Sequence, residues 1–291
     1  MNRLLECAYN DIAIADISSL RIQRKNTVHP MLNIAVRAAR SGGDFIARYI
    51  DRVESLSITE KSRNDFVSEV DKGAEKAIIE VIRKAYPDHS ILAEESGTHK
   101  GNEYEWIIDP LDGTTNFLYG FPQFAVSIAV KHKNRISHGV VYNPLSQELF
   151  SASRGEGAQL NGRRLRVTSR KSLEGALLGT GIPYRDDHMH LMDDYLGMLK
   201  ALIPGTAGIR RPGSAALDLA YVAAGRLDGF WEMDLNIWDI AAGVLLIEEA
   251  GGLVGDLSGG MDYLKTGNIV AANPKVFKAM LQKIKPFVNK S

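Results

Sequence analysis

One segment, 109–115 with the sequence Asp-Pro-Leu-Asp-Gly-Thr-Thr, most narrows what this chain can fold into. It follows residues 104–108, an aromatic and β-branched run of the kind that forms buried strands. Pro110 is expected to end the hydrogen-bonded ladder, because proline has no backbone N–H. Asp109 and Asp112 are therefore expected at the carboxyl end of a strand.

The residues after the two aspartates favour an anion. Gly113 lets the backbone approach a ligand closely, since glycine has no side chain in the way. Thr114 or Thr115 is expected to cap a helix, and the free N–H groups at a helix start bind phosphate. The segment predicts a combined metal and phosphate site.

Two further carboxylates stand at element boundaries, where side chains can converge. Glu94 closes an apolar strand and Asp239 opens an apolar helix. Taken singly, each acid could equally be a solvated charge or a helix cap. Carboxylates about 4 Å apart repel by about 4 kcal/mol per pair at an effective dielectric of about 20, so a cluster of four needs cations. Oxygen ligands select Mg²⁺, Mn²⁺ or Ca²⁺ over zinc.

The same motifs resemble the inositol monophosphatases, a family of lithium-sensitive, magnesium-dependent phosphatases, and the resemblance covers residue 29 to the C-terminus. It implies an α/β fold, a layered αβαβα sandwich with the metal site between its halves. Two segments are similar to a bacterial branch of the family, namely His29–Arg40 and Gly213–Gly225. The three shared motifs are Ala93–Ser96, Asp109–Thr115 and Trp238–Gly243.

The resemblance also implies how two or three Mg²⁺ ions would be held. The first would be bound by Glu94, Asp109 and the backbone carbonyl of Leu111. The second would be bound by Asp109, Asp112 and Asp239, so that Asp109 bridges the two ions. A third, weaker site near Glu94 would draw on Lys61, Asp65 and Asp71. Asp71 could equally lie on the polar face of an amphipathic helix.

The implied reaction is hydrolysis of myo-inositol monophosphates by a metal-activated water, which Glu94 and Thr114 would hold. Asp112 would act through the second ion, which stabilises the leaving oxygen. Backbone N–H groups of Gly113 and Thr114 would bind the phosphate. The remaining substrate contacts implied by the resemblance are Glu232, Asp239, Arg210 and Ala215. Arg210 and its neighbour Arg211 could instead be a solvated pair or an interface charge.

Two alternatives stay open. The metal motifs would also serve a phosphatase for other sugar phosphates or nucleotide phosphates. Bacterial members of the family are associated with RNA polymerase and the antitermination factors of ribosomal RNA synthesis, which makes a regulatory partner role the non-enzymatic alternative. A homodimer is a further option.

Composition places the chain among compact cytoplasmic enzymes. The formal net charge of zero argues against a general electrostatic footprint for nucleic acid. Cys7 is the only cysteine, which indicates a reducing compartment, and no run of about 20 apolar residues predicts a membrane span. His188 and His190 might suggest a transition-metal site, but an i, i+2 pair does not share a helix face, and a solvated acidic loop is the preferred interpretation.

The resemblance, which begins at His29, together with the predicted elements divides the chain into three regions. Residues 1–28 are expected to be an upstream misreading of the start or a disordered extension, the alternative being an extension that docks elsewhere. The half 29–170 is expected to carry most metal ligands, and the half 171–291 to carry Asp239. Predicted helices lie near 30–50, 66–85, 188–203, 214–225, 238–250 and 274–285. Predicted strands lie near 90–93, 105–109, 124–132, 138–142, 148–153, 176–180, 228–233, 253–256 and 268–272.

Overall fold

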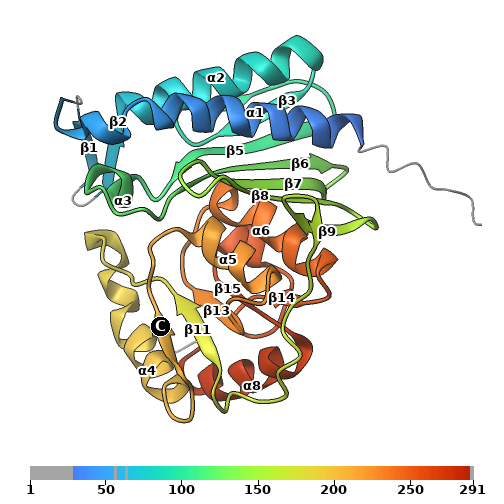
Figure 1. Cartoon of the computed structure of the whole chain (residues 1–291). Helices are drawn as coiled ribbons and strands as arrows, with labels where there is room; N and C mark the ends of the chain where they lie inside the picture. The colour runs from blue at the N-terminus through green and yellow to red at the C-terminus, as the bar shows by residue number, and fades with distance from the viewer. Residues whose placement is uncertain (1–28, 56–57, 63–64, 289–291) are drawn as a thin grey trace, which may run out of the picture.

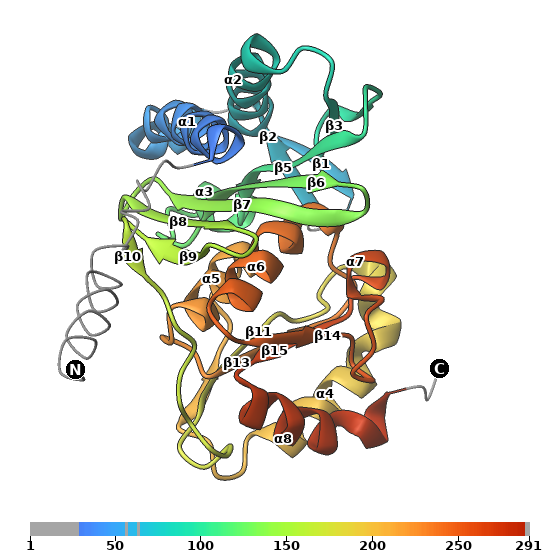
Figure 2. The same cartoon turned by 90° about the vertical axis from the view of Figure 1, so that its right-hand side faces the viewer.

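The computed structural model describes residues 29–55, 58–62 and 65–288. For those of them between 53 and 68, only the backbone is described. Within this part, helices and sheets alternate in five layers, which Figure 1 and Figure 2 show from top to bottom. A helix pair, a large sheet, a second helix pair, a smaller sheet and a third helix pair follow one another. The predicted αβαβα sandwich is confirmed. The predictions for residues 1–28 lie outside the described part.

The larger sheet has eight strands in the order β10-β9-β8-β7-β6-β5-β3-β4. Its strands are antiparallel except for β3 and β5, which run parallel. Their bounds are Ser90–Ala93 (β3), Gly97–His99 (β4), Tyr104–Asp112 (β5), Ala125–His132 (β6), Arg135–Asn143 (β7), Glu148–Ser153 (β8), Gly157–Leu160 (β9) and Arg163–Arg164 (β10).

Two helices, α1 (Pro30–Ala47) and α2 (Glu69–Ala85), cover the outer face of this sheet. Pro30 suits the first turn of α1, where its missing N–H is not needed, and the His29 Nδ1 accepts a hydrogen bond from Met31 N at 3.2 Å. The start predicted for α2 near residue 66 is wrong. The residues before it form β2 (Asp65–Ser68), which pairs with β1 (Ile58–Ser62).

The smaller sheet has five strands in the order β12-β11-β13-β15-β14 and mixes parallel with antiparallel pairs. Helices α4 and α8 cover its outer face, with the turn η2 (Asp186–Leu191) leading into α4. The bounds are Leu177–Thr180 (β11), Met192–Leu202 (α4), Gly208–Arg210 (β12), Gly229–Glu232 (β13), Leu253–Gly255 (β14), Tyr263–Thr266 (α7), Ile269–Ala272 (β15) and Pro274–Ile284 (α8).

The middle layer consists of α5 (Ala215–Ala223) and α6 (Ile237–Glu249), which lie between the two sheets (Figure 2). Residues 240–247 of α6 are all buried, because this helix packs on β5 to β9 on one side and on α5 and β14 on the other. Helix α6 lies very close to both β7 and α5. A methyl group on Gly139 of β7 would lie 2.9 Å from the Ala242 carbonyl oxygen, and one on Gly243 would lie 2.5 Å from Leu219 Cβ.

The boundary between halves at residue 170 stays a prediction. Helices α5 and α6 follow this boundary in sequence, yet they share one hydrophobic core with strands that precede it. In the described part of the chain, no helix is both long and apolar enough to cross a bilayer.

Candidate metal centre and its cleft

A cleft of about 560 Å³ opens where the ends of β5, β11 and β13 meet the starts of α5 and α6. Its lining includes Glu94, Asp109, Leu111, Asp112, Gly113, Thr114, Ala215, Glu232 and Asp239. The structure thus brings together nine residues that the sequence predicted for the site. Arg210 does not line this cleft.

An irregularity in β5 aims both aspartates of the motif at the cleft. Along a regular strand, residues three apart point to opposite faces. Here Asp109 pairs with Ser127 and Asp112 with Ala125, so that one extra residue on β5 resets the alternation. The prediction that Pro110 ends the strand is therefore wrong. The missing N–H of Pro110 interrupts the ladder within a strand that continues to Asp112.

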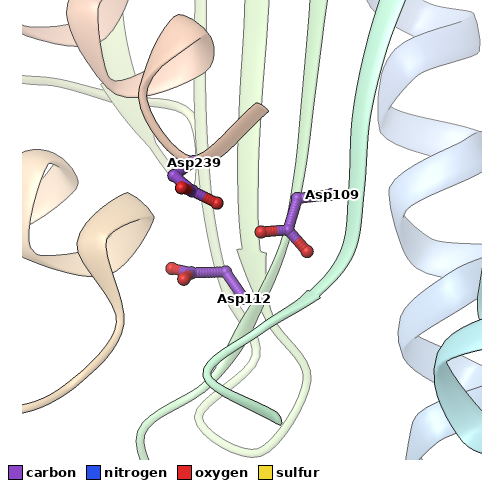
Figure 3. A group of neighbouring side chains, drawn as sticks. All are labelled: Asp109, Asp112 and Asp239. Carbon is purple, nitrogen blue, oxygen red and sulfur yellow. The ribbon is translucent and has the colours of Figure 1, made fainter. Parts of the chain in front are cut away.

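Three carboxylates form the floor of the cleft. Asp109, Asp112 and Asp239 each have an oxygen within 4.8 Å of one on the other two, and Figure 3 shows the three groups pointing toward one another. Asp239 arrives from the first turn of α6, where its Oδ2 accepts a hydrogen bond from Asn236 N at 2.7 Å. One oxygen of Asp239 thus caps the helix and the other is free to bind an ion.

Each floor aspartate is also fixed by hydrogen bonds. Asp109 Oδ1 accepts from Leu111 N at 2.9 Å. Asp112 Oδ2 accepts from the Ser214 hydroxyl at 2.6 Å and from Ala216 N at 2.8 Å. Since Ser214 and Ala216 stand at the start of α5, the larger sheet and the middle helix layer jointly orient Asp112.

The electrostatics of the floor favour bound cations. Burial raises the pKa of Asp109 and Asp239 well above the ordinary value, and neighbouring carboxylates raise both further. Burial also raises the pKa of Asp112 to about 6, although its hydrogen bonds with Ser214 and Ala216 oppose the shift. A divalent ion relieves this repulsion and restores the charged forms. The donors are all oxygen, so the residues fit Mg²⁺.

Glu94 lies beside the floor but outside the group of three. It follows β3, and its N–H donates to the Ile108 carbonyl at 3.1 Å, which places it next to Asp109 across the parallel pair. The loop is fixed by Glu75 of α2, whose Oε2 accepts from Glu95 N at 2.8 Å. The Leu111 carbonyl accepts the Thr114 hydroxyl at 3.1 Å.

The helix start after the motif differs from the prediction. Gly113, with φ of 94°, is the N-cap of the short helix α3 (Thr114–Leu118), so neither threonine caps it. The glycine is needed because a side chain there would lie 2.9 Å from the Gln123 carbonyl. The Thr114 hydroxyl instead donates to Asp71 Oδ1 at 2.8 Å, and Asp71 is almost fully buried.

Asp71 thus lies behind Thr114 rather than on an exposed helix face. Lys61 belongs to β1 and Asp65 to β2, and their side chains lie outside the described part of the chain. The third metal site therefore stays a prediction.

On the substrate side, Glu232 projects from the end of β13 against Gly181, where any side chain would overlap its carboxylate. Burial raises the pKa of Glu232 to about 8, while the nearby Arg211 lowers it. Ala215 lines the cleft at the start of α5. Arg210 ends β12 with its guanidinium exposed and donating to the Ile209 carbonyl at 3.1 Å. The next residue, Arg211, turns into the cleft instead.

The outer wall of the cleft contains residues that sequence reasoning missed or set aside. The Arg211 guanidinium lies 5.2 Å over the Tyr184 ring, and His188 Nε2 lies 3.0 Å from Asp234 Oδ2. His188 is therefore paired rather than solvated, whereas His190 is exposed and contacts the Asp187 carbonyl at 2.7 Å. No sequence motif marked the wall, because loops from separate elements build it.

Comparison with known proteins gives concordant results. A sequence profile described as the inositol monophosphatase family matches residues 27–288. The Nus factor SuhB of Pseudomonas aeruginosa is 58% identical over 263 residues, covering 89% of this chain and 97% of that protein.

Two solved structures are similar. The extragenic suppressor protein suhB of Bartonella henselae has a TM-score of 0.86 and 45% identity, covering 88% of this chain and 99% of its own. An inositol monophosphatase from Anabaena has a TM-score of 0.78 and 39% identity, covering 88% and 95%.

Proposed function

The chain belongs to the inositol monophosphatase family, and we propose that it combines a role in a transcription complex with a magnesium-dependent phosphatase centre. The first role is favoured by similarity, and the second by the geometry of the cleft. The two roles need different parts of the surface, so that each can be tested separately.

The transcription role is supported by the relative named Nus factor SuhB, at 58% identity over nearly its whole length. We propose that this chain likewise binds a component of a transcription complex, RNA polymerase or an antitermination factor. A stable protein contact needs about 800 Å² on each partner. The floor of the cleft is too recessed for such a contact, so the partner surface is expected outside it.

The phosphatase role rests on one observation, the three carboxylates that converge within 4.8 Å at the floor of the cleft. With Glu94 and the Leu111 carbonyl beside them, Asp109, Asp112 and Asp239 would hold two Mg²⁺ ions. The ions would supply an activated water and charge stabilisation of the leaving oxygen. The proposed substrates are myo-inositol monophosphates and similar polyol phosphates.

The chain's own residues would orient the reacting groups. Asp71 accepts a hydrogen bond from the Thr114 hydroxyl, so that a lone pair of the threonine oxygen would be left to hold the attacking water. Glu94 would accept a proton from that water. Backbone N–H groups of Gly113 and Thr114 would bind phosphate oxygens, and Glu232, with Ala215 N–H, would bind substrate hydroxyls.

The phosphatase proposal is tested by measuring phosphate release from a panel of inositol, sugar and nucleotide monophosphates. Release that requires Mg²⁺, is greatest for a polyol phosphate and is inhibited by Li⁺ is the expected result. The absence of release from every substrate, in protein shown by calorimetry to bind Mg²⁺, would refute it.

The transcription proposal is tested by a pull-down of purified RNA polymerase and antitermination factors with the wild type and Asp112→Asn. Both forms should retain the same partner, whereas only the wild type should release phosphate. Capture of none of these factors by the wild type would refute the partner role. Loss of capture in folded Asp112→Asn alone would show that partner binding depends on the metal centre.

A further inference from the structure

A second carboxyl group, that of Asp218, lies behind Glu232 and has no place in the reaction described so far. Asp218 belongs to α5 and is 1% exposed. Its Oδ1 is one of the buried side-chain oxygens without a hydrogen-bond partner in the described part of the chain. A buried polar atom without a partner costs free energy, so its retention calls for a physical reason.

Two glycines make the room that these carboxyl groups occupy. Gly179 and Gly181 are two residues apart along and just beyond β11, so they face the same side of the strand. A methyl group on Gly179 would lie 3.8 Å from Asp218 Cγ, and one on Gly181 would overlap the Glu232 carboxylate. The two carboxyl groups therefore face neighbouring positions, in and just after β11, where the chain has no side chains.

Burial and the neighbouring carboxylates disfavour two simultaneous negative charges on these acids. Burial raises the pKa of Asp218 well above its ordinary value, and Glu232 and Asp112 raise it further, while Arg211 lowers it. The charged groups that act on Glu232 are Arg211, Asp112 and Arg185. Burial raises the pKa of the Tyr195 hydroxyl, and Glu232 raises it further. Two neighbouring buried carboxyl groups release their protons in separate steps, because the second charge must form beside the first.

We propose that Asp218 is a positioning residue that acts through Glu232, keeping a proton and donating it in a hydrogen bond that holds the Glu232 carboxylate at the cleft. This inference rests on the proposed phosphatase function, in which Glu232 binds a substrate hydroxyl. With Asp218 as donor, one Glu232 oxygen is fixed against the core and the other is left to accept from the substrate.

The kinetic test compares Asp218→Ala, which removes the donor, with Asp218→Asn, which keeps one. Asp218→Ala should raise the KM for inositol 1-phosphate by about tenfold, the effect of one lost hydrogen bond, and leave kcat within about twofold. The KM for p-nitrophenyl phosphate, which has no polyol hydroxyls, should stay unchanged. Asp218→Asn should restore most of the inositol 1-phosphate affinity.

Asp228→Ala is the matched control. Asp228 is also a buried aspartate of this half, but it accepts from Leu177 N at 2.9 Å and pairs with Arg170, away from the cleft. The Asp228→Ala substitution should lower the melting temperature and leave the KM for inositol 1-phosphate unchanged. An unchanged KM in folded Asp218→Ala, or equal losses in Asp218→Ala and Asp218→Asn, would overturn the inference.

A second measurement does not depend on activity. In metal-free protein at pH 8, Asp218→Asn and Glu232→Gln should each raise the melting temperature, because each removes one of two competing acids. If the two acids share a proton, the rise in melting temperature of the double variant should be smaller than the sum of the rises in the two single variants. Additive gains would overturn the inference. A wild type that hydrolyses no substrate but shows non-additive gains would instead refute only the proposed phosphatase function.

Discussion

The floor and the outer wall of the cleft are built in different ways. On the floor, Asp109, Asp112 and Asp239 are each held by at least one backbone N–H. On the wall, the Arg211–Tyr184 and His188–Asp234 contacts join side chains of separate loops. Backbone donors fix a carboxylate as firmly as the fold itself, whereas contacts between partly exposed side chains are weak and easily rearranged.

The difference between floor and wall matches the different requirements of metal binding and substrate selection. A metal centre needs its ligands within a few tenths of an ångström, so the floor is tied to strands and helix starts. Substrate selection needs only a few polar groups at the rim of a cleft, and these can vary without loss of the fold. We therefore expect changes on the floor to abolish function and changes on the wall to modify it.

The largest effect is expected from Asp239→Asn or Asp112→Asn. Each removes a charge that the second Mg²⁺ needs, so activity should fall below about a tenth of the wild-type value while the fold persists. Phosphate release at saturating Mg²⁺ measures the effect, with Asp193→Asn on the exposed surface of α4 as the matched control. Near-normal turnover in either floor variant would remove the basis for treating the floor as a metal centre.

A smaller loss is expected from Ser214→Ala, which leaves the ligands in place but removes the hydroxyl that holds Asp112. Outer hydrogen-bond partners of metal ligands contribute about 10- to 100-fold in affinity, so Mg²⁺ binding measured by calorimetry should weaken by about that factor. Ser214→Thr should restore it. Ser153→Ala, which removes a buried hydroxyl bound to His138, should not change it. Equal affinities in Ser214→Ala and wild type would show that the hydroxyl is dispensable.

The pH dependence of stability should also report on the floor. Asp112 has a pKa of about 6 in the folded metal-free protein, above its unfolded value, so it keeps its proton longer when folded. Deprotonation of Asp112 should therefore lower the stability of the metal-free protein as pH rises to about 6, and deprotonation of Glu232 should continue the fall to about pH 8. Mg²⁺ binds the deprotonated form of Asp112. The rise in melting temperature on adding Mg²⁺ should therefore grow from about pH 5 to about pH 7, a range that spans this pKa. A constant Mg²⁺ effect would contradict this.

The smallest effect is expected on the wall, from Asp234→Asn. Asp234 has φ of 58°, which asparagine tolerates well, so the substitution removes only the ion pair with His188. Partly exposed pairs contribute about 0.2–1 kcal/mol, so the melting temperature should hardly change and the KM should change by less than about fivefold. A loss as large as that of Asp239→Asn would mean that wall and floor are not distinct.

Sequence alone located the floor better than the wall. The Asp-Pro-Leu-Asp-Gly segment and the acid that opens α6 are local signals, and the cleft does gather Glu94, Asp109, Asp112 and Asp239. The irregularity that turns Asp112 was not foreseeable, because it depends on pairing with β6. Arg210 was predicted from the family resemblance, whereas Arg211 lines the cleft. Which of the two adjacent side chains faces the cleft depends on where β12 ends, and the sequence does not fix that point.

Asp218 gave no signal of its own. In the sequence it is one polar residue in an apolar helix. Its place near Glu232 depends on two glycines, in and just after a strand about 40 residues earlier in the chain. The layers, by contrast, followed from hydrophobic periodicity and from the family resemblance, since both depend on many residues at once.

The central helix α6 limits how the two sheets can move relative to each other. It contacts the larger sheet so closely that Gly139 leaves no room for a methyl group beside the Ala242 carbonyl, and Gly243 meets α5 in the same way. A motion that parted α6 from the larger sheet would have to break their shared core and move Asp239 away from Asp112. If the proposed phosphatase function holds, we expect substrate entry and product release to depend on the peripheral loops around Tyr184 and Asp234 rather than on a movement of whole domains.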